Sequence, residues 1–260
     1  MNVLIVSAHP DPRSLTASLR EVAVWQLESD GHEVLVSDLH GMNWKPVVDA
    51  RDFPSHPAGE RLRVASASGA AMSAGALTDD VVAEQNKLRW ADAVILQFPL
   101  WWFSMPAILK GWVDRVYAHG FAYGVGEHSD TRWGDRYGEG SMSGKRAMLM
   151  VTTGGWEPHY GPRGINGPID DLLFPIQHGI LFYPGFAVVP PLVAYRVDRL
   201  DEAGFALLAD RVRGRMRDLF TIPPIPFRAQ NGGDYLIPEM RLRPELGRPG
   251  TAGFALHRDD

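Results

Sequence analysis

The chain alternates short apolar runs with segments of helical spacing, and this alternation constrains its fold more than any other feature. The run at 2–8 is almost wholly apolar, as expected of a strand covered on both faces. In the segment 14–31, apolar residues recur three or four positions apart, which predicts a helix ending at Gly31. We predict further strands at 32–39, 92–100, 145–153 and 186–195, and further helices at 78–91, 106–117, 167–180 and 200–220.

Strands that alternate with helices predict an α/β fold with a doubly wound parallel sheet and right-handed crossovers. Five strands suit the flavodoxin-like strand order 2-1-3-4-5. The segment 40–78 reads as a long excursion with one helix, and 118–144 as a glycine-rich loop. Pro175 is expected to break the helix over 167–180. The proline-rich tail from 221 onward has little periodicity.

Composition excludes several function classes. The chain has no cysteine, which rules out disulfides, thiol catalysis and cysteine-bound metal clusters. A net charge of −5 gives no basic surface for nucleic acid. The first apolar run has no basic segment before it, and no run of apolar residues without charge approaches about 18 residues, so we expect neither a signal peptide nor membrane insertion. The sequence predicts a soluble cytoplasmic protein without a metal site.

Three loops leave the carboxyl ends of the first, third and fourth predicted strands. Parallel strands bring these ends to one edge of the sheet, where doubly wound folds bind ligands. The first loop, AHPDPRSLT, lacks the dinucleotide glycine fingerprint and the phosphate-loop lysine. Its Ser14 and Thr16 stand at a helix start, where free amides favour an anion. His9 and Arg13 support a phosphate there, although Ser14 as a simple helix cap explains the loop equally well.

The second loop, PLWWFSMP, places three aromatic residues in a row at 101–103. They cannot all point inward, so at least one is expected to line a cavity or a subunit contact and to offer a wall for a flat ligand. The third loop, TTGGWEPHY, adds hydroxyls and amides at 152–155, with glycines that let a ligand approach the backbone. An anion site, an aromatic wall and a row of donors together fit a nucleotide with a planar ring, and flavin is the natural candidate.

Longer motifs carry a resemblance to a known family. The runs HPDPRSLT, ADAVILQFPLWWFSMPAILKGWVDRV, FAYG and VTTGGWEPHYGPRGINGPIDDLLFPIQHGIL resemble the NAD(P)H:quinone oxidoreductase family of the DT-diaphorase type. The likeness covers most of 3–220. The tail motifs PIPF and GFALH are similar to the C-terminal extension of longer members. The resemblance implies a flavodoxin-like flavin-binding domain over 1–220 and a C-terminal extension over 221–260 packed on that domain or on a dimer partner.

The resemblance also implies an activity: a flavin-dependent, ping-pong transfer of hydride from NADH or NADPH to a quinone or to a related flat acceptor, such as a nitro or azo compound. It implies a homodimer with FAD at each interface site, and the length and tail favour FAD over FMN. The flavin-binding residues that it implies are His9, Ser14, Leu15, Thr16, Pro99, Leu100, Trp101, Trp102, Phe103, Thr152, Thr153, Gly154, Gly155 and Tyr160. The implied substrate-binding residues are Trp102, Phe103, Tyr123 and Val125.

Tyr160 matches the family's catalytic tyrosine, which would donate toward developing negative charge on the flavin. The family follows it with Y-x-x-x-G-I-H-G, whereas this chain reads YGPRGING and places Asn166 at the histidine position. Asparagine donates a hydrogen bond but cannot become a cation at neutral pH. Val125 likewise replaces a second pocket tyrosine, and Trp101 stands where well-known members have glutamine.

Two other functions compete with a reductase. Relatives of this fold serve as cytosolic ancillary flavoproteins of potassium-efflux systems, and loss of the relay histidine is compatible with such a regulatory role. Retention of Tyr160 and the long extension argue against it. A one-electron flavodoxin carrier ranks last, because such carriers are shorter and strongly acidic.

Overall fold

The computed structural model describes residues 1–259 and contains the parallel sheet that the sequence predicts. Its strands follow the order β2-β1-β3-β4-β5, with β6 also paired to β4. The strands are β1 (Asn2–Ser7), β2 (Glu33–Asp38), β3 (Ala93–Pro99), β4 (Arg146–Thr152), β5 (Ala187–Val188) and β6 (Leu192–Ala194). The α-helices are α1 (Leu15–Ser29), α2 (Val64–Ser73), α3 (Asp79–Trp90), α4 (Ala107–Val116), α5 (Ile169–Ile176) and α6 (Glu202–Arg217). The α/β flavodoxin-like fold class is thereby confirmed.

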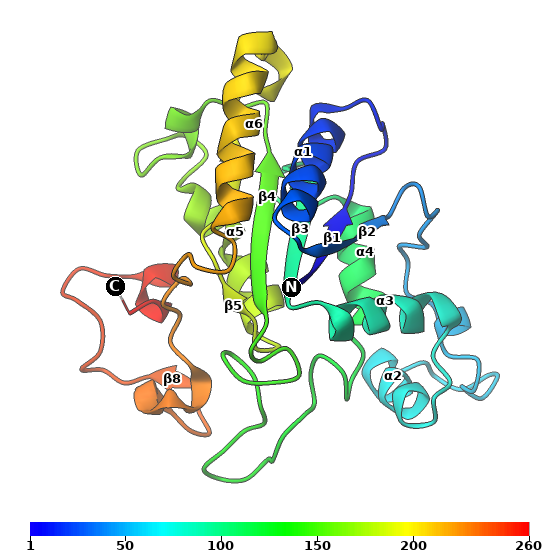
Figure 1. The fold of residues 1–260 in the computed structure, drawn as a ribbon. Coiled ribbons are helices and arrows are strands. Elements are labelled where there is room, and N and C mark those ends of the chain that lie inside the picture. The colour runs from blue at the N-terminus through cyan, green and yellow to red at the C-terminus, as the bar shows by residue number, and fades with distance from the viewer. Residues whose placement is uncertain (260) are drawn as a thin grey trace.

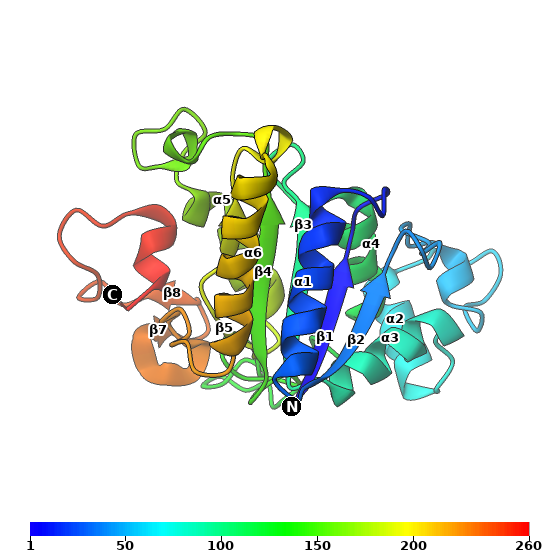
Figure 2. The ribbon, with the colours of Figure 1, turned by 45° about the horizontal axis from the view of Figure 1, so that its top comes forward.

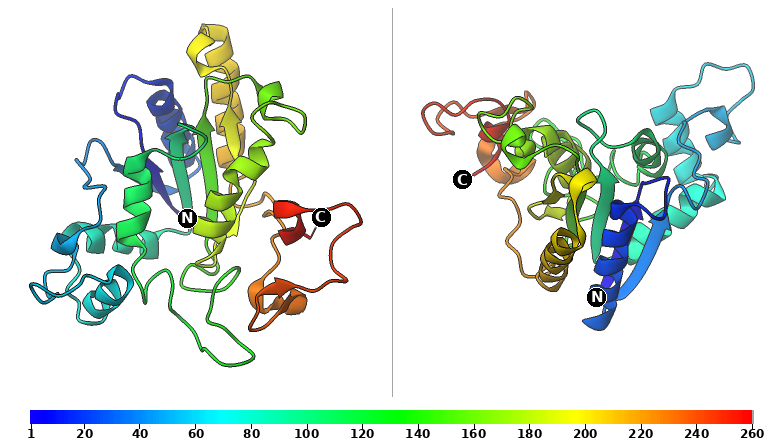
Figure 3. Two further views of the ribbon diagram at one scale, coloured as in Figure 1. Left: turned by 180° about the vertical axis from the view of Figure 1, so that it is seen from behind. Right: turned by 90° about the horizontal axis from the view of Figure 1, so that it is seen from above.

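Helices cover both faces of the sheet. Helices α1 and α6 lie side by side on one face, and α3, α4 and α5 lie on the other (Figures 1 and 2). The views from behind and from above show the same three layers (Figure 3). Strands β1, β3 and β4 are buried on both sides, which explains their continuous apolar sequences. Strand β2 is the edge of the sheet and alternates less regularly between exposed and buried positions.

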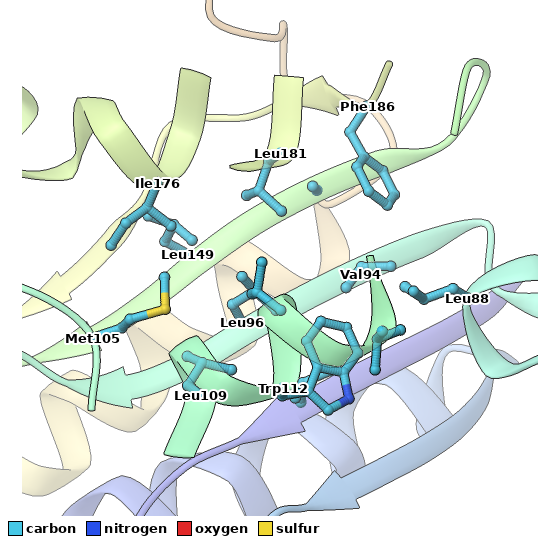
Figure 4. Close-up of a cluster of buried hydrophobic side chains, with 14 of the residues drawn as sticks. Leu88, Val94, Leu96, Met105, Leu109, Trp112, Leu149, Ile176, Leu181 and Phe186 are labelled. Carbon is cyan, nitrogen blue, oxygen red and sulfur yellow. The ribbon is translucent and has the colours of Figure 1, made fainter. Parts of the chain in front are cut away.

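The larger of the two main core clusters fills the space between the sheet and helices α3, α4 and α5. Figure 4 shows Leu96 of β3 beside Leu109 and Trp112 of α4, and Leu149 of β4 beside Ile176 of α5. Burying a large apolar side chain contributes about 1.5–3 kcal/mol. The Trp112 Nε1–H donates to Glu84 Oε2 at 2.8 Å, so the polar atom of this wholly buried ring is satisfied.

Two local predictions differ from the structure. The single strand expected over 186–195 is divided into β5 and β6, because Pro190 and Pro191 supply no amide hydrogen to continue the ladder. The break expected at Pro175 is absent: Pro175 lies inside α5, and the helix continues beyond Ile176 as a π-helical segment, Gln177–Phe182.

The C-terminal extension comprises residues 221–260, of which the structure describes 221–259. It lies beyond the β5 side of the sheet (Figures 1 and 2). It contains a two-stranded hairpin of β7 (Tyr235–Leu236) and β8 (Arg241–Leu242). It contacts the rest of the chain through stacking of Phe254 on Phe174 and through an ion pair of Arg258 with Asp170 at 3.5 Å. A domain boundary at 220 remains a prediction.

Within the described part of the chain, no helix is long and apolar enough to cross a membrane.

Candidate active site

The carboxyl ends of β1, β3 and β4 meet at one edge of the sheet and are tied together by hydrogen bonds. We call this edge, with the loops at 8–16, 99–106, 152–168 and 194–199, the carboxyl edge. The hydroxyl oxygens of Thr16 and Thr152 lie 2.9 Å apart, and the Leu100 amide donates to the Thr152 carbonyl at 2.8 Å. Gln97 Nε2 donates to the Thr16 carbonyl at 2.6 Å, and Pro99 pairs with Thr152 in register. The predicted convergence of these three loops is therefore present in the structure.

The first loop supplies a helix start whose side chains are already engaged. Ser14 Oγ accepts from the Ala17 amide at 3.1 Å and caps α1. Arg13 pairs with Asp11 at 2.9 Å, and this contact lowers the pKa of the Asp11 carboxyl to about 2. The cap interpretation of Ser14 thus holds, and the Arg13 charge is compensated within the loop. The backbone amide of Leu15, the first residue of α1, has no partner within the described chain, so an anion at this helix start remains a prediction.

The second loop is strained and exposes its aromatic side chains. Trp102 and Phe103 adopt φ angles of 50° and 62°, a region that bulky residues rarely enter. Their side chains are 94% and 48% exposed. Trp101, bridged to Ser104 through both backbone groups, is also half exposed, and its ring centroid lies 6.3 Å from that of His9. Consecutive strained residues cluster at functional sites, so this exposed wall is a candidate ligand surface.

Tyr160 folds back onto the glycines that precede it. It is buried, and its hydroxyl lies 2.9 Å from Thr153 Oγ1. A Cβ on Gly155 would stand 2.7 Å from Tyr160 Cε2, so glycine is needed for the ring to pack there. A Cβ on Gly154 would stand 2.5 Å from Asp198 Oδ2. The glycines therefore make room for protein groups, whereas the sequence had suggested a close approach of ligand.

The expected row of hydrogen-bond donors also has fewer unpaired members than the sequence indicates. Both threonine hydroxyls have protein partners, because Thr152 contacts Thr16 and Thr153 contacts Tyr160. The donors that remain are backbone amides. Within residues 1–259 no hydrogen bond is made by the N–H groups of Leu15, Thr16, Trp102, Phe103 and Gly154. Amides from all three loops are thus open to a ligand at the carboxyl edge.

A fourth loop at this edge was missed by sequence reasoning. It follows β6, and the Arg196 amide donates to the Gly155 carbonyl at 3.0 Å. The Arg196 guanidinium lies 3.8 Å from the centre of the Trp156 ring, and the Tyr195 ring centre lies 5.7 Å from that of Tyr160. Since the strand predicted at 186–195 is parallel to its neighbours, the topology alone would have placed AYRVDR at this edge.

Asn166 lies on the same loop as Tyr160. The backbone N–H of Asn166 donates to the carbonyl of His159, the residue before Tyr160, at 3.0 Å. The Asn166 side chain makes no hydrogen bond to any residue of the described chain. The neighbouring Ile165 is 93% exposed, so this loop presents both residues at the surface of the edge.

Tyr123 and Val125 lie apart from the other predicted site residues. They belong to the loop 118–144, which leaves the end of α4 and returns to the start of β4, at the opposite end of the strands (Figure 1). The Tyr123 ring makes an edge contact with His119, with centroids 5.2 Å apart. Within one chain these two residues do not join Trp102 and Tyr160.

The residues of the carboxyl edge fit a flavin on their donor chemistry. Open amides suit the carbonyl-rich rim and phosphates of a flavin nucleotide, and exposed aromatic side chains suit its planar ring. Within residues 1–259 no three histidine, aspartate or glutamate side chains gather to hold a metal ion. Fold and site together define a flavin-binding oxidoreductase of the flavodoxin-like class.

Comparison with known proteins identifies the family. The family model of the flavodoxin-like fold matches residues 1–215. The chain is 58% identical over 257 residues to the ribosyldihydronicotinamide dehydrogenase-like protein traD of Penicillium crustosum, covering 99% of this chain and 95% of that one. It is 39% identical over 230 residues to the human ribosyldihydronicotinamide dehydrogenase [quinone], covering 87% of this chain and 95% of the relative.

A solved structure of a candidate quinone reductase from Klebsiella pneumoniae superposes with a TM-score of 0.96 and 61% identity, covering 99% of both chains. The chain belongs to the NAD(P)H quinone oxidoreductase and ribosyldihydronicotinamide dehydrogenase family. It is a flavin-dependent oxidoreductase of the quinone reductase type, as the sequence resemblance predicts.

Proposed function

We propose that the protein binds FAD at the carboxyl edge, takes two electrons as hydride from NADH or NADPH, and passes them to a quinone or a related flat nitro or azo acceptor. The observation that carries this proposal is the open set of backbone amides beside the exposed rings of Trp102 and Phe103. A bound flavin supplies the hydride chemistry, and the protein supplies binding, orientation and control of charge. We place this activity in the cytoplasm.

The residues proposed to hold FAD come from all three loops. The backbone amides of Leu15 and Thr16 at the start of α1 suit the pyrophosphate, and His9 belongs to the same loop. The amide of Gly154 suits the polar edge of the ring. Trp101, Trp102, Phe103 and Leu100 provide the surface against which the ring lies. The buried Thr16–Thr152 contact holds two of these loops in place beneath the ligand.

Tyr160 is proposed as the donor that stabilises negative charge during hydride transfer. Its hydroxyl is fixed by Thr153 Oγ1 at 2.9 Å, so it need not be ordered during the reaction. If Thr153 acts as the donor in this pair, its proton frees the phenol hydrogen to point away from the protein toward a ligand. Thr153 is thus proposed to position Tyr160.

Asn166 limits how the proton is supplied. Its amide group can donate a hydrogen bond but cannot take up a proton from solvent at neutral pH. The surface position of this loop leaves water as the source of the second proton that a quinone needs to become a hydroquinone. We propose that the flavin is reduced more slowly in this protein than in relatives with a histidine at this position. We also propose that the rate lacks the pH dependence that a titrating histidine would add.

A homodimer is proposed because one chain leaves the substrate pocket incomplete. Tyr123 and Val125 lie at the far end of the sheet from Trp102, so they can reach a quinone only from a second copy. In that arrangement Trp102 and Phe103 of one chain and Tyr123 of the other enclose the acceptor. The strong exposure of Trp102 in the single chain supports such a contact.

The experiment that tests this function is spectroscopic. The purified protein is examined for a flavin spectrum, the flavin released by heat is identified, and the protein is titrated anaerobically with NADH and NADPH. We expect FAD that bleaches rapidly with at least one donor and is reoxidised by a quinone. A colourless protein that takes up no flavin overturns the proposal and favours the ancillary, regulatory role.

A further inference from the structure

A cavity lies between the C-terminal extension and the rest of the chain, and none of its lining residues belongs to the carboxyl edge. Its volume is about 440 Å³, within the range of small-molecule sites. One wall comes from the loop 118–144 and from α5 with its continuation, the other from the extension. Neither wall contains a residue that the flavin-dependent reaction uses.

The wall formed by the main body of the chain is a column of nearly parallel aromatic rings. Tyr137 stacks on His178 at a centroid distance of 4.7 Å, and His178 stacks on Phe174 at 4.6 Å. Phe254 of the extension continues the column, 4.3 Å from Phe174 and tilted by only 12°. Rings that already lie face to face, with Tyr235 and Trp133 also lining the cavity, favour a flat ligand.

The cavity also carries positive charge that is not neutralised. Arg136 lines it, and no carboxylate of residues 1–259 forms an ion pair with Arg136. Its Nε donates to Gln230 Oε1 at 2.5 Å, which orients the guanidinium but leaves its charge. Arg228, the other lining arginine, is paired with Asp234 at 2.7 Å and with Asp259 at 2.8 Å.

The lining histidines do not add to that charge near neutral pH. Burial, with His257 and Arg258 nearby, lowers the pKa of His178 to about 4. Burial and the adjacent Arg228 also lower the pKa of His257, which is hydrogen-bonded to Tyr235 Oη at 2.8 Å. Arg136 is therefore the open cation of the cavity's described lining.

We propose that this cavity is a second, non-catalytic binding site for a planar aromatic anion, of which an aromatic carboxylate is the simplest form. The ring would lie among the aromatic side chains, and the carboxylate would pair with Arg136. Charged hydrogen bonds of this kind are among the stronger ones. Because both walls would contact it, the ligand would hold the extension against the rest of the chain.

The test uses 2-naphthoate as the probe and the flavin-loaded protein as the target. Binding is measured by isothermal titration calorimetry, with 2-naphthamide as the uncharged probe of the same shape. We expect naphthoate to bind, and naphthamide to bind about tenfold or more weakly. Arg136→Gln should weaken naphthoate binding to a similar extent. Arg241→Gln, which removes the same charge from an exposed residue of the extension outside the cavity, should leave it unchanged.

Three further measurements separate this site from the carboxyl edge and from loss of structure. Trp102→Ala should leave naphthoate affinity unchanged, and Arg136→Lys should retain part of it. Naphthoate should also slow proteolytic cleavage of the extension in the unsubstituted protein. The proposal is overturned if naphthoate does not bind, if naphthamide binds equally well, if Trp102→Ala abolishes binding, or if cleavage of the extension is unaffected.

Discussion

The carboxyl edge and the cavity under the extension are assembled in different ways. At the edge, each loop begins at the carboxyl end of a strand of the parallel sheet. The register of the strands therefore brings Thr16, Thr152 and Leu100 together. At the cavity, the rings of Tyr137, Phe174 and Phe254 come from distant segments with no common strand order. Backbone topology determines the first site, and side-chain packing alone determines the second.

This difference predicts that substitutions at the edge change catalysis, and that substitutions at the cavity change stability or ligand affinity. The largest expected effect is that of Tyr160→Phe, which removes the proposed donor and keeps the ring that packs on Gly155. We expect flavin to remain bound and its reduction by NAD(P)H to slow about 100-fold. Stopped-flow measurement of flavin bleaching reports this rate.

Tyr195→Phe is the matched control, because Tyr195 lies next to Tyr160 but makes no hydrogen bond within the described chain. Its reductive rate should equal that of the unsubstituted protein. Equal rates in all three proteins would remove Tyr160 from the mechanism.

Thr153→Val should have a smaller effect of the same kind. It removes the hydroxyl that lies 2.9 Å from Tyr160 Oη but nearly preserves side-chain shape, and the backbone bond from Thr153 to Ala194 persists. We expect flavin reduction to slow about tenfold, since a hydrogen bond contributes about 1 kcal/mol and the phenol loses its orientation. Thr153→Ser should restore most of the rate, and the effect should vanish in a Tyr160→Phe background.

Much of the fold could be predicted from sequence because its signals are local. Apolar runs gave β1, β3 and β4 to within one residue, and helical spacing gave α1, α3, α4 and α6 to within about three. The division of the last strand at Pro190 was not foreseen, although two prolines in a strand are a known warning. The extension carries no periodicity, so its hairpin and its stacking on α5 could not be read.

The candidate site likewise combines features that the sequence predicts with features that it does not. The three converging loops follow from topology, and Tyr160 follows from the family motif. That Gly155 accommodates Tyr160, and that Ser14 and Thr153 are already bonded, depends on side-chain positions that a linear sequence does not contain. Tyr123 and Trp102 lie apart because their loops occupy opposite ends of the sheet. The loop with Trp102 precedes α4, and the loop with Tyr123 follows it, after α4 has brought the chain back to the other end of the strands.

Asn166→His tests the carboxyl edge by adding a titratable side chain to it. A histidine there can become a cation near its usual pKa, which restores the proton relay that the family motif implies. We expect a few-fold faster flavin reduction and a new dependence on pH between about 6 and 7. Asn166→Gln, which cannot titrate, should give neither, and a histidine variant with an unchanged rate and pH profile would show that this position takes no part.

The smallest expected effect lies at the cavity. The pKa of His178 is about 4 in the folded protein, against an ordinary value of 6.5, because burial disfavours its charged form. Between these values the unfolded chain binds more protons than the folded one, so stability is complete above about pH 6.5 and is lost as the pH falls toward 4. Since the ring is partly exposed, we expect a loss of about 1 kcal/mol.

The measurement is the urea midpoint at pH 7 and at pH 4.5, for the unsubstituted protein and for His178→Gln. Other groups facing His178, including His257 and Arg258, remain in both proteins, so their contributions cancel in the difference. The variant should lose less stability on acidification, while its rate of flavin reduction at pH 7 stays the same. If the two proteins lose equal stability, His178 is already protonated in the folded state or stays accessible to solvent, and the aromatic column does not exclude charge. If flavin reduction also changes, the cavity and the carboxyl edge are coupled, and the contrast between the two regions fails.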